Sequence, residues 1–276
     1  MRYILLFIAI FTFSCKYNIS SPVGTIKDYS ANSGKLFYTS SDAKTNDIET
    51  TLKKNKHSLG KYLIKVSPTN DKSTAILTNI KKVLNKNPHF NNVEIDLSLT
   101  EIPEIPKEMF TNTTNLGKIT LPDTVKKIEE KAFSGCYSLN SIRFPKNLQE
   151  IGESAFSSCS SLTLIILDSE QSMTISKEAF SGCSSLVNLI LPKSLTKIDN
   201  DAFKNCSQLN NVEYLGIENK PTGCSPFSNG GTNPSDLYLP SATNDNIKNC
   251  FEGKSFLGKA WNNGNIHTNQ HIPYNK

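Results

Sequence analysis

One phrase recurs along the sequence at a nearly fixed interval, and it constrains the fold more than any other feature. A phenylalanine marks each copy, and successive marks are 23, 23, 24 and 23 residues apart: Phe110, Phe133, Phe156, Phe180 and Phe203. A fixed period in the twenties is typical of a solenoid, in which each repeat packs only on its neighbours. The repeats therefore predict one elongated array rather than one or two compact domains.

The residues around each phenylalanine predict what a repeat contains. Apolar residues stand nine and eleven positions after the mark, as Ile165 and Leu167 do, and this alternation predicts a short strand with one buried face. A second isoleucine, such as Ile151, precedes each mark by five positions. No single repeat can bury its own apolar side, so the copies are expected to stack and share one core.

Cysteine recurs three residues after the phenylalanine in four copies, at Cys136, Cys159, Cys183 and Cys206. Thr113 holds the same position in the first copy. Strands in a sheet lie about 4.8 Å apart, so four stacked thiols would form a line about 14 Å long. Zinc needs ligands gathered tetrahedrally at about 2.3 Å, which excludes a zinc site. Disulfides between rungs stay open as an alternative, but parallel side chains favour free, buried cysteines that act as small apolar fillers.

The phrase AFSGCSSLVNLILPKSLTKI resembles the BspA-like leucine-rich repeats of surface proteins in host-associated bacteria. The resemblance covers residues 93–240. It implies an α/β-type repeat solenoid of leucine-rich repeats of about 23 residues, with a parallel strand in each repeat. It also implies a curved or slightly superhelical shape and an exported protein that acts by binding.

The N-terminal 46 residues predict export and a tether. Residues 1–14, MRYILLFIAIFTFS, carry one charge and an apolar run that is shorter than the roughly 20 residues of a membrane-spanning helix, as in a signal peptide. Cys15 follows a small residue, which resembles a bacterial lipoprotein signal whose cysteine is acylated. Phe13 and Thr12 depart from that motif, so secretion with an unmodified Cys15 is the alternative. Residues 15–46, rich in Ser, Thr, Asn and Lys, predict a flexible tether.

Caps are predicted at both ends of the array. Residues 47–92 predict an N-terminal cap with a strand at 62–66 and a helix that begins at Ser73 and covers the first strand of the array, at 93–97. Phe227 and a strand at 237–240 predict a degenerate last copy, and residues 241–276, with Trp261, predict an irregular cap or tail. The apolar face of the predicted helix comprises Ile76, Ile80, Val83 and Leu84.

Catalytic and cofactor motifs do not emerge from the sequence, so we expect no enzyme activity, no metal and no cofactor. His267 and His271 share the spacing of a helical metal pair, but their Asn-rich context favours a solvated tail. An enzymatic alternative would need a catalytic group near Cys250 and His267. Cys224 could pair with Cys250 in a disulfide. Arginine occurs only at positions 2 and 143, which argues against nucleic acid as a partner.

A candidate protein-binding patch lies among the strand positions that alternate with the buried ones. Most of these outward positions are polar, but Leu164, Ile166 and Ile190 are aliphatic and fall on two adjacent rungs. The alternatives are that isolated exposed aliphatics are common, or that a dimer or the tail covers them. The polar rim of the predicted patch comprises Arg143, Asn188 and Glu213.

Together these patterns predict a lipid-anchored protein of the bacterial cell envelope, at the outer membrane or exposed on the surface. Its solenoid would bind a protein ligand, and the membrane contact would be the N-terminal lipid. The resemblance implies adhesion to host matrix or cell-surface proteins. The alternative is a structural or assembly scaffold that binds other bacterial envelope proteins.

Overall fold

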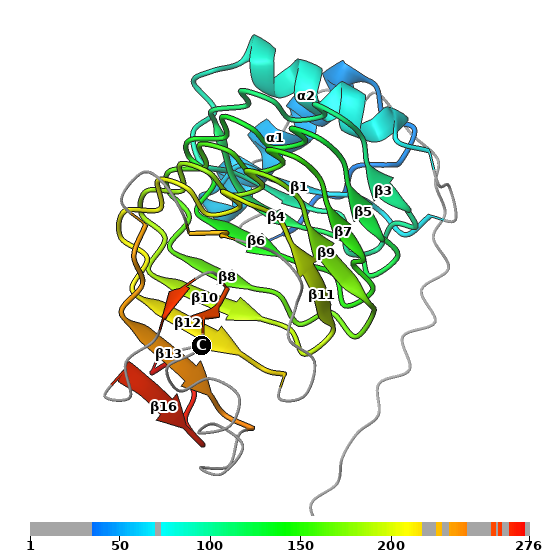
Figure 1. Cartoon of the computed structure of the whole chain (residues 1–276). Helices are drawn as coiled ribbons and strands as arrows, with labels where there is room; N and C mark the ends of the chain where they lie inside the picture. The colour runs from blue at the N-terminus through cyan, green and yellow to red at the C-terminus, as the bar shows by residue number, and fades with distance from the viewer. Residues whose placement is uncertain are drawn as a thin grey trace, which may run out of the picture.

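Parallel strands stacked into a solenoid make up most of the protein, as a computed structural model shows (Figure 1). The structure describes residues 35–69, 73–216, 225–227, 232–241, 255–257, 259–260 and 265–273. Two helices cover one end of the stack, and the last strands lie at the other end (Figure 1). The predicted fold class, a leucine-rich repeat solenoid with a parallel strand in each repeat, is confirmed.

The predicted strand of each repeat lies on one side of the solenoid, which we call the strand face. Its register follows the repeat, since Leu189 lies opposite Ile165 on one side and Val212 on the other. These strands form two parallel sheets rather than one, in the orders β1-β2-β4-β6 and β16-β13-β12-β10-β8. The strands are β1 (Leu63–Lys65), β2 (Val93–Asp96), β4 (Leu116–Thr120), β6 (Ser141–Arg143), β8 (Leu164–Ile166), β10 (Asn188–Leu191), β12 (Asn211–Tyr214), β13 (Asp236–Leu239) and β16 (Ile266–Thr268).

A third parallel sheet, on another side of the solenoid, is unbroken and contains the other isoleucine of each repeat. Its order is β11-β9-β7-β5-β3, and all of its pairs are parallel. Ile151, for example, lies between Ile128 and Ile175, and all three are buried. The strands are β3 (Glu104–Ile105), β5 (Lys127–Ile128), β7 (Glu150–Ile151), β9 (Met173–Ile175) and β11 (Leu195–Ile198). A separate antiparallel pair, β14 (Ser255–Phe256) and β15 (Lys259–Ala260), lies near the C-terminus.

The repeated phenylalanines form a continuous ladder of stacked rings inside the solenoid. Ring centroids from Phe110 through Phe203 are 5.0 to 5.4 Å apart, and neighbouring planes differ by 12° or less. The backbone supports this stacking, since the Phe133 N–H donates to the Ala155 carbonyl at 2.7 Å and the pattern repeats along the array. Every ring in this series is fully buried, so the ladder is the core of the array.

Left-handed backbone conformations flank each phenylalanine two residues before and two residues after it. Glu178 (φ 54) and Gly182 (φ 76) flank Phe180, and most of the equivalent residues are not glycine. A left-handed residue with a Cβ is strained by about 1–2 kcal/mol, and glycine is not. The Gly in the repeated phrase AFSGC therefore marks a tight turn. The other copies use Glu108 and Asn112, Lys131 and Gly135, Ser154 and Ser158, and Asp201 and Asn205.

The four ladder cysteines are free and buried, as predicted. Each thiol also donates a hydrogen bond to the phenylalanine carbonyl of the preceding rung, as Cys183 Sγ does to Phe156 O at 3.3 Å. Burial raises the pKa of the Cys136 thiol to about 12, so it stays protonated at neutral pH and is a poor nucleophile. Thr232 makes the equivalent bond in the rung of β13, where its hydroxyl donates to Phe203 O at 2.7 Å.

The N-terminal cap contains one helix more than the sequence predicts. The predicted helix is α2 (Ala75–Lys86), and its predicted apolar face is buried. A preceding helix, α1 (Thr45–Leu59), packs against α2 and β1. The tether prediction is wrong for residues 35–46, since Thr39 forms a bridge with Val66 and the Phe37 N–H donates to Asn55 Oδ1 at 2.9 Å. Neither helix, within the described ranges, is long and apolar enough to cross a bilayer.

The C-terminal end of the array lies beyond the predicted boundary at residue 240. The predicted degenerate copy is present, with Phe227 tilted by 35° at the end of the ring ladder and β13 at the predicted strand. However, β16 pairs with β13 in parallel, with Tyr238 opposite His267. Residues 266–268 therefore add a further rung to the strand face, in a segment where the sequence predicted an irregular tail.

Candidate functional site

The strand face is interrupted between β6 and β8, which are the end strands of two different sheets (Figure 1). In the neighbouring rungs a hydrogen bond precedes the strand pairing, from Asn140 N to Gly117 O and from Val187 N to Thr163 O, both at 2.9 Å. The equivalent bond between Thr163 and Asn140 is missing from the described structure. We call this interruption the split.

The split is confined to the strand face. Behind it, β7 and β9 pair in register, with Ile151 opposite Ile175. The rings of Phe133 and Phe156 stack at 5.0 Å between the same two rungs. The Cys159 thiol also bridges them by donating to Phe133 O at 3.2 Å. The two rungs are therefore held together on their other sides while their strands are separated.

Phe144 lies directly after β6, beside the split. It holds the repeat position eleven residues after the mark, where the adjacent copies have Leu121 and Leu167. Its ring packs edge-on against Phe156 at 5.5 Å and reaches Phe180 at 6.3 Å. An aromatic ring at this position does not by itself open the sheet, because Tyr214 holds the same repeat position, is buried, and lies in β12, which pairs with both β10 and β13.

The split opens a groove of about 440 Å³ into the core. Ile142 is only partly buried there, whereas the equivalent residues of the neighbouring rungs, Ile119 and Ile165, are fully buried. The groove thus combines aliphatic and aromatic side chains with polar ones. Its lining comprises Asn140, Ser141, Ile142, Arg143, Phe144, Thr163, Leu164, Ile166 and Asp168.

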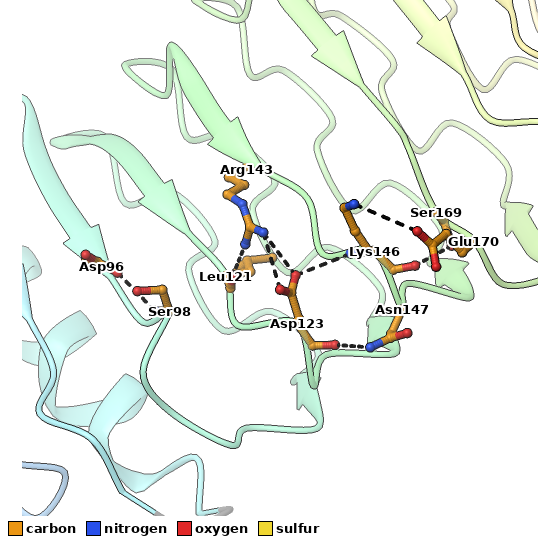
Figure 2. A network of polar contacts seen from close by, with 9 residues as sticks. All are labelled: Asp96, Ser98, Leu121, Asp123, Arg143, Lys146, Asn147, Ser169 and Glu170. Atoms are coloured by element: carbon orange, nitrogen blue, oxygen red, sulfur yellow. Dashed lines mark hydrogen bonds and ion pairs between the residues drawn. The ribbon is translucent and has the colours of Figure 1, made fainter. Parts of the chain in front are cut away.

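A polar network links the loops that follow β4, β6 and β8 at one end of the groove (Figure 2). The Arg143 guanidinium turns toward the previous rung, where it contacts both carboxylate oxygens of Asp123 at 3.2 and 3.3 Å. Between the next two rungs, the Glu170 N–H donates to Lys146 O at 2.9 Å, and Ser169 Oγ donates to the same carbonyl at 3.2 Å. These contacts hold the Arg143 side chain against the β4 rung and join the loops that follow β6 and β8.

The predicted binding patch is only partly present. Leu164 and Ile166 are half-buried and line the groove, and Arg143 lies on the opposite wall. The expectation that Ile190 and Glu213 are exposed is wrong, since they are 3% and 1% exposed.

The C-terminal tail covers these two residues, which is one of the alternatives left open by the sequence. Ile272 packs in a small cluster with Ile190 and Tyr238. The Glu213 carboxylate accepts the Ile272 N–H at 2.9 Å and contacts His271 Nδ1 at 2.5 Å. Asn188, the last predicted rim residue, is half-buried and accepts a side-chain bond from Asn211 at 2.7 Å.

The other candidate groups do not assemble into a chemical site within the described ranges. His267 lies in β16, where its Nε2 is 2.8 Å from Asp236 Oδ1, so it is neither a helical metal ligand nor part of a solvated tail. No three side chains of the usual metal-ligating types gather among the described residues. Cys15, Cys224, Cys250 and Trp261 lie outside the described residues, so what the sequence predicts for them stays a prediction.

Sequence reasoning did not single out the groove, although two signals for it exist. Phe144 breaks the aliphatic pattern, and Asp168 stands where the copies around it have Pro145 and Pro192. The 24-residue spacing between Phe156 and Phe180 falls in the same region. Each irregularity on its own is common in repeats, and their joint effect depends on packing between rungs.

Comparison with protein families agrees with the observed repeat. The model of the BspA type leucine rich repeat region matches residues 103–229 and 173–270, in six copies. The chain belongs to this family. Leucine-rich repeats of this kind typically serve as non-enzymatic scaffolds for protein interaction. The match extends past residue 240, as does the array in the structure.

Three solved structures illustrate what the BspA-type chain is similar to. A leucine-rich repeat protein of T. pallidum is 26% identical, with 56% of this chain and 82% of that chain covered and a TM-score of 0.42. A leucine-rich cell surface protein of Faecalibacterium prausnitzii is 32% identical (46% and 33% covered, TM-score 0.43). A leucine-rich repeat protein of Bacteroides ovatus is 27% identical, with 65% of this chain and 51% of that chain covered and a TM-score of 0.39. The chain therefore spans at most about half the length of the last two proteins. No curated protein matches the chain.

Proposed function

We propose that this BspA-type chain is a bacterial cell-surface module that binds host matrix or host-cell proteins through the strand face. The observation that carries the proposal is the groove at the split, which is lined by the partly buried side chains of Ile142, Leu164 and Ile166. An opening into the core of a repeat array costs stability, because the apolar surface it exposes loses burial. A partner that covers it would recover that burial on binding.

Three observations support placing the module at the surface. The chain belongs to a family of interaction scaffolds, and one similar protein is described as a cell surface protein. The N-terminal segment has the composition of an export signal followed by Cys15. In this proposal Cys15 carries the lipid that anchors the protein in the envelope. The alternative partner is another bacterial envelope protein, for which the chain would act as a scaffold.

Two measurements test this proposal. Biolayer interferometry of the full exported chain on immobilised fibronectin, laminin and collagen should detect binding that is lost in the double variant Leu164→Lys, Ile166→Lys. Protease added to intact cells should digest the chain. Binding only to envelope extract, with the chain protected from protease, would instead support the scaffold.

A matched control separates the groove from the rest of the surface. Val187 is another hydrophobic residue, 38% exposed, and it is not part of the groove lining. The variant Val187→Lys should bind the same proteins as the original chain. Equal loss of binding in the control and in the double variant would mean that added positive charge, and not the groove, explains the result.

A further inference from the structure

The C-terminal end of the described chain covers an apolar part of the strand face that adjoins the groove. Ile272 packs in one cluster with Ile190 of β10 and Tyr238 of β13, and Ile166 of β8 packs against the same cluster. Ile166 also lines the groove. The covered surface and the groove therefore share the Ile166 side chain, and the C-terminal residues cover only one part of this joint surface.

The attachment of these residues is small. β16 pairs with β13, and directly after it the backbone turns at Asn269, whose φ of 54° is left-handed. Within residues 269–273, which we call the covering segment, Ile272 is the one buried residue. A stretch with few buried contacts opens locally while the rest of the fold stays intact. The covering segment can therefore detach beyond Asn269 while β16 stays paired.

Glu213 provides the polar contact of the covering segment. Its carboxylate lies in β12 and the residue is 1% exposed. Its partners among the described residues are the Ile272 N–H at 2.9 Å and His271 Nδ1 at 2.5 Å. Detachment returns this carboxylate to water, which offsets part of the burial that Ile272 loses. The closed and detached arrangements are thus closer in free energy than the apolar contact alone would make them.

The stack of repeats does not depend on this contact. The ring ladder and the bonds of the ladder cysteines do not involve the covering segment. On β6, Arg143 holds the repeat position of Ile190 and is exposed, so a rung of the array needs no cover there. Caps that a solenoid needs close its terminal rungs, whereas Ile272 lies over the side of strands within the sheet.

We infer that the covering segment is an autoinhibitory cover that controls access to the strand face beside the groove. The inference rests on the proposed protein-binding function and adds how the same surface is regulated. Detachment joins Ile190 and Tyr238 to Leu164 and Ile166 in one apolar surface. A partner that contacts this larger surface binds only the detached state. Its apparent association constant is then the intrinsic one multiplied by the detached fraction.

Thiol labelling measures the detachment itself. In the variant Ile190→Cys, iodoacetamide should alkylate the new thiol slowly, because Ile272 covers it. Adding Ile272→Asp should accelerate this alkylation by about tenfold or more, since a second carboxylate beside Glu213 is repelled. Adding Gln270→Asp instead, at an exposed position, should leave the rate unchanged. Peptide mass spectrometry separates position 190 from the native cysteines, and equal rates in the two combined variants would overturn the inference.

Binding to immobilised fibronectin, laminin and collagen measures the regulation. Ile272→Asp in the full chain should raise the association constant by about tenfold or more, because it increases the detached fraction. Gln270→Asp should bind as the original chain does. Both variants add one negative charge to the same segment, so the comparison separates detachment from charge.

The outcomes distinguish this inference from the proposed function. Binding by the original chain that Ile272→Asp leaves unchanged or weakens would overturn the autoinhibitory cover and leave the proposed function standing. Binding by Ile272→Asp alone, with none by the original chain, would support both. Absence of binding in all three chains would contradict the proposed function, and its regulation with it.

Discussion

The ladder cysteine shows how a single small side chain can join two rungs. Its sulfur fills a buried position, and its proton bonds to the carbonyl of the preceding phenylalanine, as Cys183 does with Phe156. Thr232 makes the same bond with a hydroxyl in the rung of β13. Thr113, at the first position of the series, has a buried hydroxyl without a hydrogen-bond partner. The position therefore favours a small side chain with a donor over a purely apolar one.

Substitutions at Cys183 should separate the donor from the volume. Cys183→Ala should lower the free energy of unfolding by about 1–2 kcal/mol, because it removes both a hydrogen bond and packed volume. Cys183→Ser, which keeps the donor, should cost less than alanine. Phe180→Ala, which removes a ring of the central ladder, should cost about 3–5 kcal/mol. Urea unfolding followed by circular dichroism measures all three. A serine variant with a lower free energy of unfolding than the alanine variant would contradict the role of the thiol as donor.

At the scale of elements, the C-terminal segment acts as a clasp on the strand face. It contributes β16 to the sheet and then crosses the outward side of the neighbouring strands. The Glu213 carboxylate is nearly inaccessible there and accepts the Ile272 N–H. A buried carboxylate costs free energy unless it is hydrogen-bonded, so the segment and Glu213 depend on each other.

The variant Ile272→Lys should detach this clasp. The loss of one buried isoleucine should lower the free energy of unfolding by about 1.5–3 kcal/mol at most. Amide exchange of Ile272 should accelerate, because its acceptor, the Glu213 carboxylate, becomes hydrated. Gln270→Lys, at an exposed position of the same segment, is the control and should change neither quantity. An equal effect of the two variants would show that charge, rather than burial of Ile272, holds the segment.

At the scale of the whole molecule, the stability of the array comes from stacking rather than from charge. Stacked rings and buried isoleucines run along its interior, and the helix α2 covers the N-terminal end. Most of the ion pairs among the described residues lie at the surface, as in Lys107 with Glu130, whose side chains are 58% and 34% exposed. Exposed pairs of this kind contribute little to folding.

Salt should therefore affect the unfolding of the full chain only weakly. Raising NaCl from 0.1 to 1 M should change the free energy of unfolding by less than about 1 kcal/mol, because salt screens mainly exposed ion pairs that contribute little to stability. Urea titrations at the two salt concentrations provide the measurement, since urea is uncharged. A large loss of stability at high salt would show that the networks around Arg143 and Lys146 hold the rungs together.

The repeat itself could be predicted from the sequence. The phase of Phe180, Leu189 and Ile198 within one copy predicted their burial, and the four free cysteines followed from the same register. The helix α2 was predicted from one apolar face. These features depend on local periodicity and on contacts between adjacent copies, which a periodic sequence displays directly.

The candidate site could not be predicted without the folded structure. Ile190 has the spacing of an exposed strand residue, but a segment about 80 residues further along the sequence covers it. The split lies between only one pair of rungs, β6 and β8, and a periodic pattern does not mark it. Repetition in the sequence therefore determined the stack. The tertiary structure decided where the stack is covered and where it opens, because both depend on contacts that occur only once.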